Sequence, residues 1–417
     1  MEQPPVTPAL VLRKSINALN FARRNGWGSM LRLAHRKIGE QSGLFGRADI
    51  FEQYAFLSPA PIGNKIAADA VGTRTINWFI PRVGKGSGGH LNIFRFIKNL
   101  EDQGFECRII IVDNPLPKSA VVAKQDIHRW FFPLKAQVFV GTDGLPPAYF
   151  SFATSWQTAY TVRAFQATVT RCYFVQDFEP WFFPAGSEAL MAEATYHFGF
   201  QGFTAGGWLA EKLRSEYAMQ TCALGFSFDK DLYHPGQKPE DGTRRVFFYA
   251  RPPTARRAFE LGMLVLREVC RQRSDVTVVL AGWDVSHYEI PFPCEHLGLV
   301  EIEDLPGIYQ RCDVALVLSC TNLSLLPLEL MASGVPVVSN DAPHTRWLLN
   351  DETSALAAAT VEDLSSKVLK VLNEEDYAKS LRMTGIDYAN RTSWALESEK
   401  MALRLTQLAS TVDQIAD

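Results

Sequence analysis

The sequence predicts an α/β protein built from two successive parallel-sheet units. From residue 75 onward, short runs rich in β-branched and aromatic residues alternate with helical stretches, which is typical of parallel strands joined by crossover helices. A polar stretch containing Gly and Pro, residues 233–245, interrupts this alternation, which then restarts. The length of 417 residues also favours two domains over a single core.

The first unit opens with "TINWFIP", which has the composition of a buried strand, and continues with a helix that ends at Gly104. Its strands are expected at 75–81, 107–113, 136–141, 148–155, 170–177 and 196–205. In the second unit, strands are expected at 245–250, 276–282, 294–300, 313–319 and 335–340, and helices at 255–272, 303–311, 327–333, 361–374 and 394–410. Two such units form a cleft, and parallel sheets bind ligands at the carboxyl ends of their strands.

These boundaries divide the chain into four parts. We expect a helical extension at 1–70, a first α/β domain at 71–236, a second at 237–392, and a C-terminal helix at 393–417 that packs back towards the first domain. The first fifty residues carry eight Lys and Arg against three acids, with apolar residues at roughly helical spacing. This segment either packs on its own protein or lies with its basic face on anionic lipid.

Composition excludes several classes of protein. A net charge of −3 argues against a general nucleic-acid binder, and no apolar run approaches the roughly 20 residues of a membrane span. Seven cysteines stand singly, without the spacing of a metal site, which indicates reduced thiols and a cytoplasmic protein, peripheral at the inner face of the cell membrane if 1–50 binds lipid. We therefore expect no metal and no resident cofactor.

A glycine loop, "PRVGKGSGGHLNIFR", follows the first strand and opens a helix. Gly84, Gly86 and Gly89 satisfy G-x-G-x-x-G, so an NAD(P)-dependent oxidoreductase is one interpretation, although three residues separate the strand from the glycines. The backbone amides of Gly88 and Gly89, at the start of the helix, suit a phosphate in either interpretation. A glycine-rich turn without a ligand is the third alternative.

Arginines follow the first strand of the second unit. Arg251 comes directly after it, and Arg256 and Arg257 lie about one turn further on. Guanidinium groups at the carboxyl end of a strand suit a diphosphate, because they are always charged and form paired bonds. The alternative is a solvated basic face.

Several motifs, taken in order, resemble those of retaining family 4 glycosyltransferases, which have the GT-B fold. They are "GSGGH", "FDKDLYHP", "YARPPTARRA", "HLGLVEIEDLPGIYQRCDVALVLS" and "LLPLELMASGVPVV". The likeness runs over about residues 75–400. Residues 173–196 and "YARP" are similar to the bacterial subgroup of S-layer-glycan and polysaccharide rhamnosyltransferases, which transfer L-rhamnose from dTDP-rhamnose.

The resemblance implies two Rossmann-like domains facing a cleft and a nucleotide-diphosphate-sugar donor. By this resemblance, Glu329 matches the second acid of the family's E-x7-E motif, and the resemblance implies that it binds the ribose of the nucleotide. The first acid is replaced by Thr321, so sugar contact by Thr321 or Asn322 is an inference, and a 6-deoxy sugar would suit this less polar loop. The helix amino terminus after Leu325 and Leu326 is expected to face the diphosphate.

Acceptor-side candidates follow the strand that ends in "QDFEP". Asp177 and Glu179 are candidates for orienting the acceptor or accepting its proton, unless they cap a helix or bind a loop, and His90 is a weaker candidate for contact with sugar or phosphate. Trp156, Phe178 and Trp181 form either a stacking floor for a glycan or part of the core.

The sequence thus predicts a retaining, metal-independent glycosyltransferase that moves a sugar, best assigned as L-rhamnose, onto a growing bacterial polysaccharide or glycolipid. The alternatives are the NAD(P)-dependent oxidoreductase and a GT-B-shaped glycan-binding protein that has lost catalysis, an option raised by the missing acid.

Overall fold

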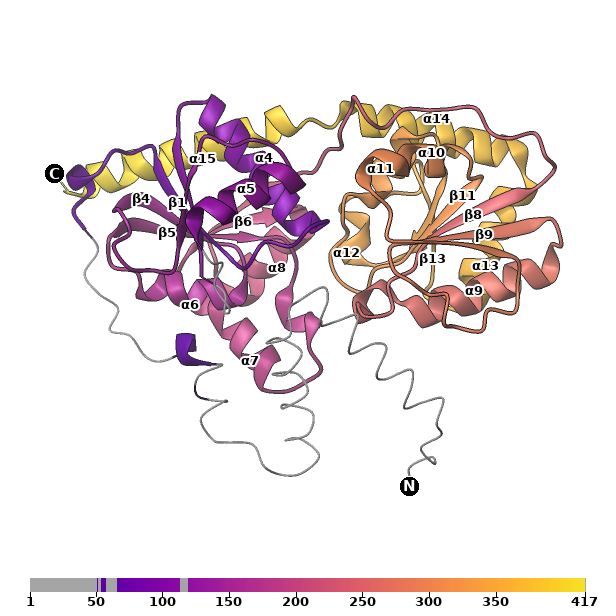
Figure 1. The fold of residues 1–417 in the computed structure, drawn as a ribbon, viewed down its shortest axis with the longest axis horizontal. Helices are drawn as coiled ribbons and strands as arrows, with labels where there is room; N and C mark the ends of the chain where they lie inside the picture. The colour runs from indigo at the N-terminus through magenta and orange to yellow at the C-terminus, as the bar shows by residue number, and fades with distance from the viewer. Residues whose placement is uncertain (1–50, 52–53, 58–65, 113–118, 417) are drawn as a thin grey trace, which may run out of the picture. The chain divides into compact units, whose positions relative to one another are not determined.

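The computed structural model describes residue 51 and residues 54–57, 66–112 and 119–416. The chain divides into two compact units, residues 1–59 and 60–417. In the first unit the structure describes a single 3₁₀ turn, η1 (Ala55–Leu57). All other elements below belong to the second unit (Figure 1). Of the extension predicted at 1–70, residues 1–50, on which the expected lipid contact falls, lie outside the described residues, and the described part contains the turns η1 and η2 (Ala68–Ala70).

A seven-stranded parallel sheet forms the first domain, with the strand order β3-β2-β1-β4-β5-β6-β7. Its elements are η2 (Ala68–Ala70), β1 (Thr75–Ile80), α4 (Gly88–Asp102), β2 (Glu106–Ile111), α5 (Ala120–Trp130), β3 (Gln137–Val140), β4 (Ala148–Ala153), α6 (Trp156–Ala164), β5 (Thr168–Val175), η3 (Glu179–Phe182), α7 (Ser187–Ala194), η4 (Thr195–His197), β6 (Gln201–Ala205), α8 (Gly207–Tyr217) and β7 (Thr221–Leu224).

A six-stranded parallel sheet forms the second domain, with the strand order β10-β9-β8-β11-β12-β13. Its elements are β8 (Arg244–Tyr249), η5 (Ala255–Arg257), α9 (Phe259–Gln272), β9 (Val276–Ala281), β10 (Cys294–Gly298), η6 (Ile302–Asp304), α10 (Leu305–Gln310), β11 (Val314–Val317), α11 (Leu326–Ala332), β12 (Val337–Asn340), α12 (Pro343–Arg346), β13 (Ala355–Ala357), α13 (Val361–Asn373), α14 (Glu375–Arg391) and α15 (Trp394–Ala416).

The predicted class of fold, two parallel-sheet α/β domains, is confirmed. In each sheet the order reverses next to the first strand of the domain, as β1 pairs with both β2 and β4, and β8 with both β9 and β11. Such a reversal opens a crevice outside the carboxyl ends of the strands. The loops after β1 and β4, and those after β8 and β11, therefore border the two crevices, and the loop after β5 follows the next strand of the first sheet.

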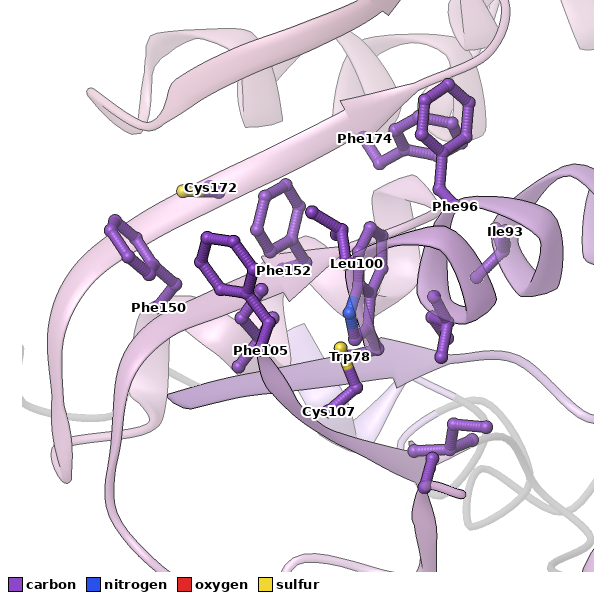
Figure 2. Packing of buried hydrophobic residues seen from close by; sticks show 14 of the residues in the cluster. Trp78, Ile93, Phe96, Leu100, Phe105, Cys107, Phe150, Phe152, Cys172 and Phe174 are labelled. Atoms are coloured by element: carbon purple, nitrogen blue, oxygen red, sulfur yellow. The ribbon is translucent and has the colours of Figure 1, made fainter. Parts of the chain in front are cut away.

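The core of the first sheet is aromatic. Trp78 on β1 stacks on Phe152 of β4, with ring centroids 4.3 Å apart, and Leu100 of α4 covers them (Figure 2). Burial of each such side chain stabilises the fold by roughly 2–3 kcal/mol. Since β1 and β4 are buried on both faces, their hydrophobic runs are continuous rather than alternating.

The last two helices serve different domains. α14 packs on α11 in the second domain, whereas α15 packs on α4 and β7 of the first sheet (Figure 1). Met401 and Leu405 of α15 are completely buried in the first core, and the Tyr149 hydroxyl donates to the carbonyl of Ala409 at 3.1 Å. α14 was not expected from the sequence.

The cysteines form no disulfide in the structure. Cys107, Cys172 and Cys312 are buried, Cys320 is exposed, and the others are half-buried. Within the described part of the chain, no helix combines the length and apolar character needed to cross a membrane.

Candidate functional site

Asp177 is the point at which loops from the two sheets meet. It follows β5, and its Oδ1 accepts hydrogen bonds from the backbone N–H groups of Phe178 and Asn322, both at 2.8 Å. Its Oδ2 accepts from the Thr321 hydroxyl at 2.8 Å and lies 3.6 Å from Nε of Arg256. Burial raises the pKa of Asp177, and these donors and arginines oppose the rise.

Thr321 and Asn322, the predicted sugar-contacting residues, are therefore occupied by the protein itself. Both are 1% exposed. The Asn322 amide nitrogen donates to the carbonyls of Gln176 at 3.0 Å and Ala205 at 2.7 Å, which ties the loop after β11 to the ends of β5 and β6. In this arrangement the loop holds the two domains together instead of presenting open polar groups.

Three arginines gather at the carboxyl end of β8. Arg251 donates to the Tyr249 hydroxyl at 2.8 Å, Arg257 donates to Ser319 Oγ at 3.1 Å, and Arg256 lies over the ring of Phe182 at 4.1 Å. Burial lowers the pKa of Arg256 and of Arg257, and the other guanidinium charges add to this effect. The predicted alternative of a solvated basic face does not fit Arg257, which is half-buried and hydrogen-bonded inward.

Ser319 connects these arginines to the neighbouring strand. Its hydroxyl donates within the loop to the carbonyls of Thr321 and Asn322, at 3.0 and 3.1 Å. Asn340 at the end of β12 pairs with the Ser319 backbone through both its amide oxygen and its amide nitrogen, at 3.0 and 2.8 Å. His344 Nε2 lies 3.0 Å from the Ser319 carbonyl, so it carries the proton and donates.

Glu179, the second predicted acid, is fully engaged as a structural anchor. Its two carboxylate oxygens accept from the Trp156 backbone N–H at 2.8 Å and from the Tyr173 hydroxyl at 2.9 Å, while its own N–H meets the Tyr196 hydroxyl at 3.0 Å. It is 6% exposed, and burial raises its pKa to about 7 against these hydrogen bonds. Glu179 fixes η3 between β5 and α6.

The glycine loop lies beside this cluster. Gln176 donates to the Gly89 carbonyl at 3.1 Å, which joins the start of α4 to the end of β5. A Cβ at Gly89 would meet Gln176 at 3.5 Å, an ordinary contact, and one at Gly88 would meet nothing within 4 Å. In the dinucleotide fingerprint the third glycine is required for close helix packing, and here it is not.

His90 contacts both ends of the glycine loop through its ring nitrogens. Its Nδ1 lies 2.8 Å from Oγ of Ser87, the N-cap of α4, and its Nε2 lies 3.2 Å from the Pro81 carbonyl. The ring is 8% exposed. Both nitrogens thus hold the loop in place, and neither projects towards a ligand in this arrangement.

Glu329 lies in a separate group on the linker side of α11. This half-buried carboxylate hydrogen-bonds the Tyr233 hydroxyl and faces Arg95 of α4. Burial raises its pKa to about 7, while Arg95 and Tyr233 oppose the rise. Nη1 of Arg95 is buried without a hydrogen-bond partner among the described residues. The isolated acid therefore has protein partners, and they come from the other domain and the linker.

Of the predicted aromatic residues, Trp156 and Phe178 are each 3% exposed and belong to the core, so their side chains offer no surface to an acceptor. Trp181 is 45% exposed. Two residues that were not predicted, Trp208 of α8 and His344 of α12, contact Trp181. Each follows the carboxyl end of a strand, β6 or β12, and that position was the available signal.

The amino terminus of α11 contributes little on its own. Leu325 is its N-cap, and the helix has seven residues with Pro327 in its first turn. A helix this short has a weak macrodipole. In the described part of the chain, no group of three His, Cys, Asp or Glu residues is placed to hold a metal ion.

One family model and one relative are similar to parts of this chain. A family model described as the C-terminal domain of WsaF matches residues 244–382. The O-antigen biosynthesis protein RfbC of Myxococcus xanthus is 32% identical over 363 residues, which cover 82% of this chain and 28% of RfbC. The chain thus spans less than a third of the length of that relative.

Solved structures share the arrangement of both domains. Sucrose-phosphate synthase from Thermosynechococcus elongatus has a TM-score of 0.63 at 14% identity, covering 81% of this chain and 100% of that one. Anabaena Alr3699/HepE, solved in complex with UDP-glucose, has a TM-score of 0.63 at 15% identity, covering 80% and 99%. At such identities the likeness is one of fold. The protein therefore has the GT-B fold, and its second domain is similar to the C-terminal domain of WsaF.

Proposed function

We propose that the protein is a glycosyltransferase that moves a sugar from a nucleotide-diphosphate donor onto a bacterial polysaccharide or glycolipid. The observation that carries this proposal is the cluster of Arg251, Arg256 and Arg257 at the carboxyl end of β8, with the carboxylate of Asp177 beside it. The excess of positive charge at a strand end of a GT-B fold suits a diphosphate. The name of the relative RfbC supports a role in polysaccharide synthesis.

The proposed donor is dTDP-L-rhamnose, and the proposed outcome is retention at the anomeric carbon. The support is the resemblance of residues 173–196 and 249–252 to rhamnosyltransferases and the replacement of the first motif acid by Thr321. Glu329 is proposed to bind the ribose, for which it would exchange Tyr233 and Arg95 for the two hydroxyls. The amides of Gly88 and Gly89 are proposed to meet the phosphates.

In this proposal the arginines stabilise the departing diphosphate. Fixed donors aimed at developing negative charge supply several kcal/mol of transition-state stabilisation. The bond from the anomeric carbon to the phosphate oxygen breaks, the acceptor oxygen bonds to that carbon on the same face, and the leaving phosphate oxygen takes the acceptor proton. Asp177 is proposed to orient the acceptor hydroxyl, because it borders both Arg256 and the loop after β11.

Ligand-induced thermal stabilisation tests the donor. A ligand that binds only the folded state at 100 times its Kd stabilises it by about 2.7 kcal/mol. dTDP should raise the Tm of wild type and raise that of Arg256→Ala much less, whereas NAD should raise neither. A shift with NAD and none with dTDP, UDP or GDP would favour the oxidoreductase.

Turnover distinguishes an enzyme from a binding protein. dTDP-, UDP- and GDP-sugars are incubated with short glycan acceptors, and release of the nucleotide diphosphate is measured. We expect dTDP-rhamnose to give the highest rate. Binding of dTDP without release from any donor would support the inactive glycan-binding alternative.

Membrane attachment through residues 1–50 is a further part of the proposal, supported by the excess of basic residues there. Flotation with liposomes containing anionic lipid should retain the full chain and lose a chain lacking those residues. Equal flotation of both chains would reject membrane attachment through residues 1–50.

A further inference from the structure

An aromatic surface borders the arginine cluster. Trp181 and Phe182, at the end of η3, are 45% and 37% exposed. Rings of this size normally stabilise a fold by burial, and an exposed pair beside a strand end indicates a contact surface. With Trp208 and His344 they form what we call the aromatic platform.

The rings of the platform come from three elements and both domains. Trp181 of η3 and Trp208 of α8 lie 5.8 Å apart between centroids, tilted by 36°. The ring of His344, from α12, stands edge-on to both, at 6.1 and 5.6 Å and at 79° and 67°. Within this group of rings Trp181 keeps 45% of its surface exposed.

The platform is held rigidly from below. Glu179, at the first position of η3, is anchored through hydrogen bonds to the backbone of Trp156 and to the hydroxyls of Tyr173 and Tyr196. The ammonium group of Lys212 lies 5.2 Å from the Trp181 ring centroid. A surface ordered in advance loses little conformational entropy on binding.

The platform is contiguous with the proposed donor site. The guanidinium of Arg256 lies 4.1 Å from the ring centroid of Phe182 and 3.6 Å from Asp177. A single ring therefore separates the proposed diphosphate ligand from the exposed indole. Trp181 lies four residues after Asp177, the residue proposed to orient the acceptor hydroxyl, and its ring contacts that of Phe178, the neighbour of Asp177, at 5.0 Å between centroids.

We infer that the platform binds a pyranose ring of the acceptor glycan, stacked with its C–H face on Trp181. The polar border fits a sugar and not an acyl chain: Lys212 is a donor, and His344, which donates through Nε2 to Ser319, keeps Nδ1 as an acceptor for a hydroxyl. The assignment of this sugar as the acceptor rests on the proposed function. The stacking itself does not.

Saturation-transfer difference NMR tests the stacking without any donor. The probes are the methyl glycosides of α-L-rhamnose, α-D-glucose and α-D-mannose, and the protein is the full chain. For at least one probe, wild type should transfer saturation to ring C–H protons. Trp181→Ala should weaken binding about two- to tenfold, as expected for loss of one aromatic contact, and Trp181→Phe should restore part of it.

Controls separate stacking from folding. Leu190→Ala removes an apolar side chain that is more exposed than Trp181 (66% against 45%) from α7 of the same domain, and this variant should bind as wild type does. His344→Ala leaves Trp181 in place and should weaken binding through the lost hydroxyl contact. Absence of saturation transfer for all three probes in wild type, or equal transfer in wild type and Trp181→Ala, overturns the inference.

The same variants separate this inference from the proposed function. All of them should retain the thermal shift with dTDP, because the arginines are unchanged. Sugar binding that depends on Trp181 in a protein that does not bind dTDP would retain the platform and reject the donor assignment. A dTDP shift without sugar binding would reject the platform alone.

Discussion

At the scale of single residues, Asp177 determines how much positive charge the arginine cluster presents. Its carboxylate lies 3.6 Å from Arg256 and also acts on Arg257. At this distance a carboxylate offsets part of the attraction that a guanidinium exerts on a phosphate. The same group is hydrogen-bonded to Thr321 and Asn322, so the anion site and the contact between domains share one side chain.

Asp177→Asn should therefore bind dTDP more tightly and transfer sugar more slowly. Removal of about 1 kcal/mol of opposing charge lowers the Kd by roughly fivefold, while the acceptor loses the group proposed to orient it. Calorimetric titration with dTDP measures the first effect, and turnover measures the second. Asp275→Asn is the matched control, because Asp275 pairs with Arg273 at the amino end of β9. A weaker affinity in Asp177→Asn would contradict this account of the cluster.

Glu179 should make the protein less stable as the pH rises from about 4.5 to about 7. Its folded-state pKa, about 7, lies above the ordinary value of 4.5, so the folded state binds the extra proton in that window. The free energy of unfolding then falls with rising pH, by on the order of 3 kcal/mol for this group.

Urea unfolding of wild type and Glu179→Gln at pH 4.5, 5.5 and 7.5 measures this effect. The amide keeps an oxygen for the Trp156 N–H and can donate to Tyr173. The free energy of unfolding of the variant should therefore increase relative to that of wild type as the pH rises. Glu211→Gln, on the exposed part of α8, should follow wild type at each pH. A pH-independent difference between wild type and Glu179→Gln would show that the anchor is ionised throughout.

The residue types at the site could be predicted from the sequence, but their partners could not. Arg251 and Asp177 were identified because they stand at the ends of strands, and Arg256 because it follows Arg251 by about one turn. That Asp177 would accept from Thr321, 144 positions away, depends on tertiary packing that no local pattern encodes. The choice between core and stacking floor for Trp156 and Phe178 was left open for the same reason, since an aromatic residue after a strand suits either a core or a surface.

At the scale of elements, close approach of helices to the sheets depends on particular glycines. In the first turn of α9, a Cβ on Gly262 would fall 2.1 Å from Cζ of Phe248 on β8. α14 contacts α11 in a similar manner, because a Cβ on Gly385 would lie 3.2 Å from Cγ of Met331. These glycines set the depth to which each helix packs.

Gly262→Ala should destabilise the protein by about 1–3 kcal/mol, although alanine favours a helix by about 1 kcal/mol. The clash with the Phe248 ring exceeds the gain in propensity. Gly307→Ala in α10 is the control, since its Cβ would meet nothing within 4 Å, and it should be neutral or stabilising. Thermal unfolding measures both, and equal Tm values would contradict the packing argument.

Most of the strands and the helices α4, α9, α10, α11, α13 and α15 were expected from the sequence, whereas the strands β7 and β13 and the helix α14 were not. Its buried residues are Leu381, Gly385 and Ala389, two of them small, so its apolar stripe is too faint to register as a helix. α13, directly before it, buries six residues and was expected within one residue of its observed end. A helix that packs through small side chains has a weak hydrophobic pattern in its own sequence, because its packing depends on the shape of the neighbouring helix.

At the scale of the whole molecule, the C-terminal helix makes the first core depend on the end of the chain. Leu405→Ala should lower the free energy of unfolding by about 3 kcal/mol, because a fully buried leucine is lost next to Met401 and the first sheet. Leu403→Ala, on the 60% exposed side of the same helix, should change it by less than about 0.5 kcal/mol. Tryptophan fluorescence in urea measures the free energy of unfolding of both variants. A loss for Leu405→Ala as small as that for Leu403→Ala would show that α15 is dispensable to that core.

The chain passes between the two domains at Gly225–Thr243 and again at Thr392–Ser393, and these passages touch. The Thr392 hydroxyl donates to Oγ of Ser227 at 2.9 Å, and Glu397 accepts from the Gly225 N–H at 2.7 Å. Two covalent passages joined at one place form a hinge, about which one domain can rotate relative to the other but along which it cannot slide. A small swing there would carry Thr321 and Asn322 away from Asp177 and unmask the carboxylate, the arginines and the loop in a single movement.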